Sequence, residues 1–195
     1  MQAKLILALF VSFVSIATFT TEAVGRPAQE AARATAVEPV TVILVRHAET
    51  AADTKTSRDP ELSEAGQERA AALAELLSAS GVTHVFASEY QRTQATVHGV
   101  AEAAGVDVTV VSAREPEAQL TAIQALPPGS VAVVAGHSNT VPGLVKRFGG
   151  TVENLHEDPN YGPMLAHDEY GRLFVVTLPA GEATRPHALE LRYGQ

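Results

Sequence analysis

Residues 41–45 read Thr-Val-Ile-Leu-Val, and this stretch decides the fold class. A continuous run of β-branched and apolar residues is typical of a strand buried on both faces, as in parallel sheets covered by helices. Residues 131–135, Val-Ala-Val-Val-Ala, show the same pattern. Two such strands require helices on both sides of the sheet. The sequence therefore predicts an α/β protein.

Segments with helical periodicity alternate with these and other strands. Residues 64–77 carry an apolar stripe that includes Leu73, Leu76 and Leu77, with Ser63 as the N-cap. Further helices are expected over residues 90–104 (ended by Gly105), 115–125 and 140–148, and further strands over 83–87, 106–111, 172–178 and 188–193. This alternation predicts a three-layer α/β/α sandwich with a mostly parallel central sheet. Residues 151–171 lack clear periodicity and are expected to form a loop that borders the site.

The first residues have the layout of a secretory signal peptide. Lys4 precedes an apolar run over residues 5–19, and Ala23-Val24-Gly25 fits a small-x-small cleavage site. We expect a signal peptide over residues 1–25, a linker over 26–38 and one domain over 39–195. The location expected is periplasmic or secreted, with no stable membrane insertion after cleavage. A retained membrane anchor is the alternative, although the apolar run is shorter than a spanning helix needs.

Composition excludes several classes of function. The 195-residue chain has a formal net charge of -8, which disfavours a nucleic-acid partner. It contains no cysteine, so disulfides, thiolate metal sites and cysteine nucleophiles are excluded. The histidines and carboxylates between residues 156 and 168 match no metal-ligand spacing. We therefore expect neither a metal nor a cofactor. Composition leaves the oligomeric state open.

Basic side chains follow three of the predicted strands. Arg46 and His47 come directly after the first strand, Arg92 follows the second, and His137 follows the strand at 131–135. Because ligands bind at the carboxyl ends of parallel strands, these side chains can converge at one edge. Two guanidinium groups match a phosphate dianion, and a neutral imidazole can attack phosphorus. The set indicates phosphoryl transfer.

Four segments resemble those of the histidine phosphatase superfamily, also called the phosphoglycerate-mutase-like family. They are Leu44 to Thr50 (LVRHAET), Leu62 to Gln67 (LSEAGQ), Ser88 to Thr96 (SEYQRTQAT) and Val133 to Thr140 (VVAGHSNT). Each motif alone is weakly specific, but their order and spacing are shared with the family. The resemblance runs from Val42 to about Val145 and implies the phosphoglycerate-mutase-like fold.

The resemblance also implies roles for single residues. His47 corresponds to the phosphorylated nucleophile, Arg46 and Arg92 to phosphate ligands, and His137 to a donor to the phosphate. Ala48 departs from the family, which usually has glycine there; this change is tolerable unless the backbone needs a positive φ. Ser138 stands where some members carry an aspartate that acts as the acid.

The general acid is therefore open. Other members use a glutamate after the third strand, which makes Glu115 the first candidate and Glu117 the alternate. Both also suit the first turn of a helix, where acidic residues are favourable. Glu49 and Arg69 are interpreted as charges at a helix start and on a helix surface.

We expect an exported hydrolase of phosphate monoesters, of the histidine acid phosphatase type, with a phosphohistidine intermediate on His47. Its partner would be a phosphorylated small molecule or a phosphoprotein. The alternatives are a phosphohistidine protein phosphatase, a phosphoglycerate-type mutase and an inactive phosphate-binding module. Export argues against the mutase, because the sugar phosphates of central metabolism are cytoplasmic.

Overall fold

A computed structural model describes residues 38–51, 58–179 and 186–194. The predicted signal peptide and nearly all of the predicted linker lie outside the described residues. The described part contains a six-stranded sheet with the order β3-β2-β4-β1-β7-β8. Its strands are β1 (Val40–Arg46), β2 (His84–Ala87), β3 (Val108–Val110), β4 (Val131–Gly136), β7 (Arg172–Leu178) and β8 (His187–Arg192).

The sheet is parallel where the site residues arise. Strands β3, β2, β4 and β1 pair in parallel, whereas β7 is antiparallel to β1 and β8 is antiparallel to β7. The predicted mixed α/β sandwich with a mostly parallel sheet is confirmed. In the central pair Arg46 lies opposite Gly136, so β1 and β4 end side by side.

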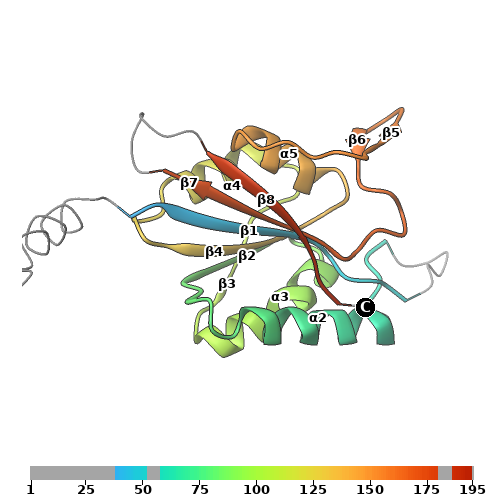
Figure 1. Cartoon of the computed structure of the whole chain (residues 1–195). Helices are drawn as coiled ribbons and strands as arrows, with labels where there is room; N and C mark the ends of the chain where they lie inside the picture. The colour runs from blue at the N-terminus through green and yellow to red at the C-terminus, as the bar shows by residue number, and fades with distance from the viewer. Residues whose placement is uncertain (1–37, 52–57, 180–185, 195) are drawn as a thin grey trace, which may run out of the picture. The chain divides into compact units, whose positions relative to one another are not determined.

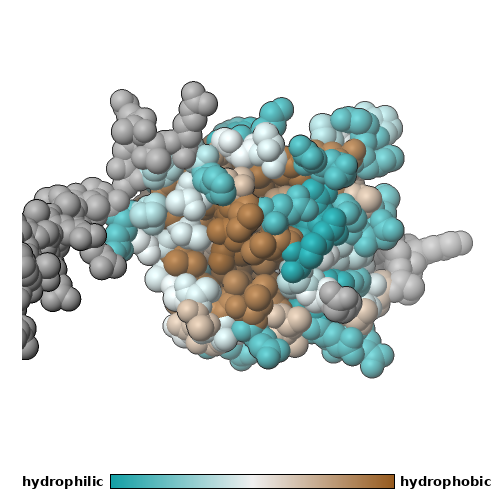
Figure 2. All heavy atoms as spheres, viewed as in Figure 1, coloured by the Kyte–Doolittle hydropathy of each residue, from teal (hydrophilic) through white to brown (hydrophobic). Residues whose placement is uncertain are grey.

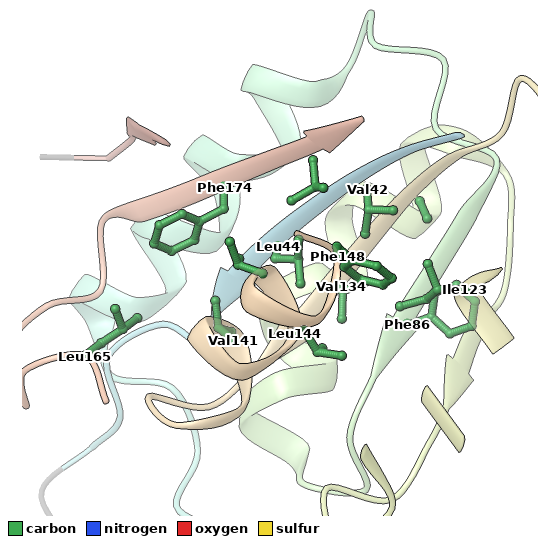
Figure 3. Packing of buried hydrophobic residues seen from close by; sticks show 13 residues of the cluster. Val42, Leu44, Phe86, Ile123, Val134, Val141, Leu144, Phe148, Leu165 and Phe174 are labelled. Carbon is green, nitrogen blue, oxygen red and sulfur yellow. The ribbon is translucent and has the colours of Figure 1, made fainter. Parts of the chain in front are cut away.

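Helices cover both faces of the sheet (Figure 1). Helices α2 (Glu64–Leu77) and α3 (Gln91–Ala104) pack on one face, and α4 (Pro116–Gln124) and α5 (Thr140–Arg147) on the other. Alternate β1 residues serve the two cores: Val42 and Leu44 join the α4 and α5 side (Figure 3), and Ile43 and Val45 the α2 and α3 side. This explains why β1 is apolar at each of residues 42–45.

Local capping signals place the predicted helices accurately. The Ser63 side chain accepts a hydrogen bond from Gly66 N, and Gly105 ends α3 in the left-handed conformation with φ of 67°. The prediction that Leu76 belongs to the buried stripe is wrong, since it is 53% exposed. Leu73 and Leu77, four positions apart, face the sheet and are buried, whereas Leu76 points to the side.

Residues 151–171 are less irregular than expected. They contain a two-stranded hairpin, β5 (His156–Asp158) and β6 (Gly162–Met164), which lies beyond the end of α5 in Figure 1. Three-residue strands are too short to produce a readable alternation, so this hairpin has no clear sequence signature. The hairpin supplies Tyr161 and Met164 to the site described below.

Apolar residues also reach the surface of the domain. Figure 2 shows them gathered over the sheet on the face turned toward the viewer. Leu189 and Leu191 of β8 are 48% and 43% exposed.

Within the described ranges, no helix combines the length and apolar character required to span a membrane.

Candidate active site

The two predicted site histidines lie side by side at the carboxyl ends of β1 and β4. His47 N donates a hydrogen bond to Gly136 O at 2.9 Å, which fixes the chain leaving β1 against the end of β4. The imidazole rings of His47 and His137 are 5.5 Å apart, centroid to centroid, in an edge-to-face arrangement. The sheet register thus brings together residues that are 90 positions apart in the chain.

His47 is a neutral imidazole, and one of its two ring nitrogens is hydrogen-bonded to the backbone. Its Nδ1 lies 2.9 Å from Ala48 O, and a carbonyl only accepts, so Nδ1 carries the proton. Nε2 of the neutral ring then has a lone pair. Burial and, to a lesser extent, the neighbouring charges of Arg46, His137 and Arg92 together lower the pKa of His47 to about 3. The ring therefore has the protonation state that a nitrogen nucleophile needs at neutral pH.

A chain of hydroxyl groups orients His137. Thr93 Oγ1 lies 2.7 Å from Tyr90 O and 3.2 Å from Ser88 O, and thus donates to a carbonyl. Ser88 Oγ, 2.8 Å from Thr93 Oγ1, then donates to that oxygen and accepts from His137 Nε2 at 3.0 Å. This polarity puts a proton on Nε2 and leaves Nδ1 for a ligand. Burial lowers the pKa of His137 to about 4.

Arg46 is a buried guanidinium with spare hydrogen-bonding capacity. Its Nη1 donates to the carbonyl oxygens of Ala166, His167 and Glu169, and its Cζ lies 4.1 Å from the centre of the Tyr170 ring. Its Nε is buried and has no hydrogen-bond partner. Burial is the main cause that lowers its pKa. An unpartnered buried donor is costly, so this nitrogen favours an anionic acceptor.

Arg92 lies in the first turn of α3 and is paired with Asp59. Its Nη1 is 3.0 Å from Asp59 Oδ1, and its Cζ lies 4.3 Å from the centre of the Tyr90 ring. The second oxygen of Asp59 accepts from Gln91 N at 2.7 Å. The carboxylate therefore lies at the N-terminus of α3, where an anion is favoured.

These side chains surround an open cavity of about 460 Å³. Its lining residues are His47, Tyr90, Arg92, Ala113, Arg114, His137, Ser138, Asn139, Thr140, Tyr161, Met164 and His167. Arg46 precedes His47 in the chain and does not line the cavity, but its charge is close enough to lower the pKa of His47. The predicted set of Arg46, His47, Arg92 and His137 is thus brought together, in a cavity with a cationic wall.

Ala48 is accommodated without strain. Among the described non-glycine residues only Asn154 has a positive φ, so the backbone at Ala48 is open to an alanine. The Ala48 side chain is fully buried, and its N–H donates to Thr96 Oγ1 at 2.9 Å. The departure from the usual glycine therefore leaves the loop intact.

The candidate acids lie outside the cavity lining. Glu115 occupies the N-cap position of α4 without a side-chain capping bond, and Glu117 forms an ion pair with Arg147 at 2.6 Å. Glu89 is also near, but its carboxylate accepts from Ala113 N at 2.7 Å, and this hydrogen bond lowers its pKa. No carboxylate of the described residues lines the cavity.

The interpretation of Glu49 and Arg69 as separate surface charges is wrong. Arg69 Nε lies 3.0 and 2.9 Å from the two Glu49 oxygens, and Nη2 lies 2.7 Å from Oε1. Arg69 Nη1 also donates to the carbonyl oxygens of Tyr193 and Gly194. This pair ties α2 and the last described residues to the segment that follows His47. Both side chains are largely buried, at 12% and 22% exposed.

Residues 42–115 match the family model of the histidine phosphatase superfamily (branch 1). The match confirms the resemblance carried by the motifs. A search of curated proteins finds no significantly similar sequence.

Solved structures show the same fold. The SixA protein of Agrobacterium tumefaciens is 22% identical, with a TM-score of 0.56 over 77% of this chain and 97% of that one. The protein histidine phosphatase SixA complexed with tungstate is 18% identical, with a TM-score of 0.56 over 78% and 96%. The mycobacterial glucosyl-3-phosphoglycerate phosphatase is 15% identical, with a TM-score of 0.54 over 79% and 98%. The histidine phosphatase fold is therefore shared across nearly the whole length of these proteins.

The lowered histidine pKa values predict that the domain loses stability in acid. In the unfolded chain His47 takes up a proton as the pH falls through about 6.5, whereas in the folded chain its pKa is about 3. The folded state therefore has its full stability with respect to His47 above the pKa of the unfolded chain. This stability is lost as the pH falls toward the pKa of His47 in the folded chain. Between pH 7 and 5 we expect His47 to reduce the free energy of unfolding by about 2 kcal/mol.

Denaturant unfolding of the wild type and of His47→Gln at both pH values measures this difference. The contributions of the carboxylates cancel in the comparison. An equal loss of stability in the two proteins would contradict the lowered pKa.

Proposed function

We propose that the protein is an exported phosphomonoesterase that transfers the phosphoryl group of its substrate to His47 and then to water. The observation that carries the proposal is the state of His47, a buried neutral imidazole whose Nδ1 is bound to Ala48 O and whose Nε2 is unprotonated. An imidazole nucleophile must have one unprotonated nitrogen before it attacks phosphorus. Export rests on the signal-peptide pattern of residues 1–25.

In the first step, His47 Nε2 attacks phosphorus. The N–P bond forms with the lone pair of the imidazole, and the P–O bond to the alcohol breaks. The alcohol oxygen leaves with the bonding pair and takes a proton from a general acid, for which Glu115 is the candidate. In the second step water attacks the phosphohistidine and gives a proton back to the conjugate base of that acid, the N–P bond returns its electron pair to the ring, and inorganic phosphate is released.

The basic groups stabilise the transferring phosphoryl group. Arg46 Nε offers its unpartnered N–H, and Arg92 approaches from the N-terminus of α3. The dianion raises the pKa of His137, so that this ring binds a second proton and donates from Nδ1 while Ser88 retains Nε2. Such preorganised donors act where charge develops in the transition state.

A phosphohistidine phosphatase is the second candidate. The specific observation is that no carboxylate of the described residues lines the cavity. An alkoxide leaving group needs a proton as its bond breaks, whereas an imidazole leaving group is far less basic. The SixA neighbours carry this activity in their names, and their likeness to this chain extends to the fold alone.

A leaving-group panel tests both candidates. Purified mature protein is given an alkyl phosphate, p-nitrophenyl phosphate and a phosphohistidine peptide, together with the variant Glu115→Gln. A phosphomonoesterase with Glu115 as acid is expected to hydrolyse all three, and Glu115→Gln to slow the alkyl ester strongly and the nitrophenyl ester little.

The other outcomes are equally informative. Turnover of phosphohistidine without the alkyl ester selects the second candidate. Equal effects of Glu115→Gln on both esters, or none on either, remove Glu115 from the mechanism. No turnover of any compound would leave the inactive phosphate-binding module.

A further inference from the structure

A second cavity adjoins the one that contains the histidines. It has a volume of about 440 Å³ and lies between α5 and the β5–β6 hairpin. Asn139 and Tyr161 line both cavities, so the two are continuous along one surface. The segments that form the second cavity lie next to each other in Figure 1, where the hairpin extends past α5.

The two shared residues leave the junction open. Asn139 is the N-cap residue of α5, but its side chain makes no capping hydrogen bond. Tyr161 is 67% exposed, so its ring lines both cavities at the surface and is not buried between them. A phosphoryl group attacked by His47 must have its leaving group on the far side of phosphorus, because the two bonds lie roughly in line. The leaving group thus needs a surface beyond the phosphate, and the second cavity offers one that adjoins the first cavity at Asn139 and Tyr161.

The lining of the second cavity is mainly apolar. Pro142 of α5, Val152, Leu155 and Pro163 contribute carbon surface, and Lys146 contributes the charged group. Val152 and Leu155 also pack against the hydrophobic core, which fixes their positions. No carboxylate belongs to the part of this lining that the structure describes. The chemistry favours an apolar group that carries no positive charge.

We propose that this second cavity binds the alcohol part of the substrate, and that the substrates are phosphate monoesters of apolar alcohols, either aryl or medium-length alkyl. The inference rests on the proposed function and adds the class of leaving group. Transfer of each methylene group from water to an apolar surface contributes up to about 0.8 kcal/mol. Lys146 in this cavity and Arg114 in the first disfavour a cationic alcohol such as choline.

A chain-length series tests the proposal with alcohols of nearly equal basicity. The values of kcat/KM are measured for ethyl, butyl and hexyl phosphate and for phosphocholine. We expect hexyl phosphate to exceed ethyl phosphate by about tenfold or more, given partial burial of the added methylene groups. Phosphocholine is expected to fall below butyl phosphate.

Gly143→Leu locates the effect. Gly143 lines the second cavity and a Cβ there meets no atom within 4 Å, so we expect a leucine side chain to occupy part of this cavity. We expect the hexyl-to-ethyl ratio to fall toward one in this variant. Ala71→Leu, on the exposed side of α2, is the matched control and is expected to retain the full ratio.

Two results would overturn the proposal. The first is a hexyl-to-ethyl ratio near one in the wild type, and the second is an unchanged ratio in Gly143→Leu. Failure of the proposed function is distinct, because none of the phosphate esters would then be hydrolysed.

Discussion

His47→Ala is expected to abolish phosphatase turnover, with a loss of at least about 1,000-fold in kcat. The variant removes the buried, unprotonated nitrogen of the residue that directly follows Arg46, which is the nucleophile of the proposed mechanism. Phosphate binding by the remaining groups does not replace the covalent step. The measurement is hydrolysis of p-nitrophenyl phosphate by the purified variant, whose folding is checked by circular dichroism.

Three further variants and a search for the phosphorylated residue test whether the loss of turnover reflects a covalent role of His47. Arg46→Ala, Arg92→Ala and His137→Ala each remove one stabilising contact and are expected to cost on the order of 100-fold. Rapid acid-free quenching followed by mass spectrometry is expected to find a phosphate adduct on a peptide that contains His47. Near-normal turnover by His47→Ala, or an adduct on another residue, would rule out the covalent mechanism proposed for this site.

Gly66→Ala is expected to destabilise the domain by about 3 kcal/mol. A Cβ at this position would overlap Glu49 O and would lie 3.0 Å from the Glu49 carbonyl carbon. These are backbone atoms two residues from His47, and they are held by the Ser63 N–H and by the pairing of Glu49 with Arg69. The loop must therefore shift, which also misplaces the nucleophile.

Denaturant unfolding checks the effect on stability, and kcat checks the effect on the site. Gly143→Ala is the control, because its Cβ enters open space and replaces a helical glycine. That variant is expected to be neutral or slightly stabilising. A loss under about 1 kcal/mol in Gly66→Ala would mean that the close approach of α2 to the His47 loop is easily relaxed.

The sequence predicts the elements whose signals are local. Residues 42–45 have no polar position, and such a run is typical of a strand covered on both faces. Ser63 and Gly105 mark helix ends through their own backbone chemistry, and the structure places those ends as predicted. The convergence of Arg46 and His137 also follows, because parallel strands end at one edge of the sheet.

The contacts that the sequence did not reveal are long-range. Arg69 reaches Glu49 across 20 positions, and Ser88 reaches His137 across 49. Each pair depends on how a helix or strand end packs against another element, and an isolated arginine or serine has no pattern that names its partner. Ser88 begins the SEYQRTQAT motif, but its contact with His137 depends on how the ends of β2 and β4 lie in the fold. The β5–β6 hairpin was missed because its strands are too short.

Arg92 already carries a counter-anion. Asp59 Oδ1 pairs with Arg92, and Asp59 Oδ2 accepts a hydrogen bond from the first free N–H of α3. A phosphate that binds Arg92 must displace this carboxylate, so its binding free energy is reduced by the contacts that Asp59 loses. If the proposed reaction occurs, we expect the Asp59 carboxylate to compete with inorganic phosphate for the Arg92 guanidinium after hydrolysis. We expect this competition to weaken product inhibition and to favour release of phosphate over its retention.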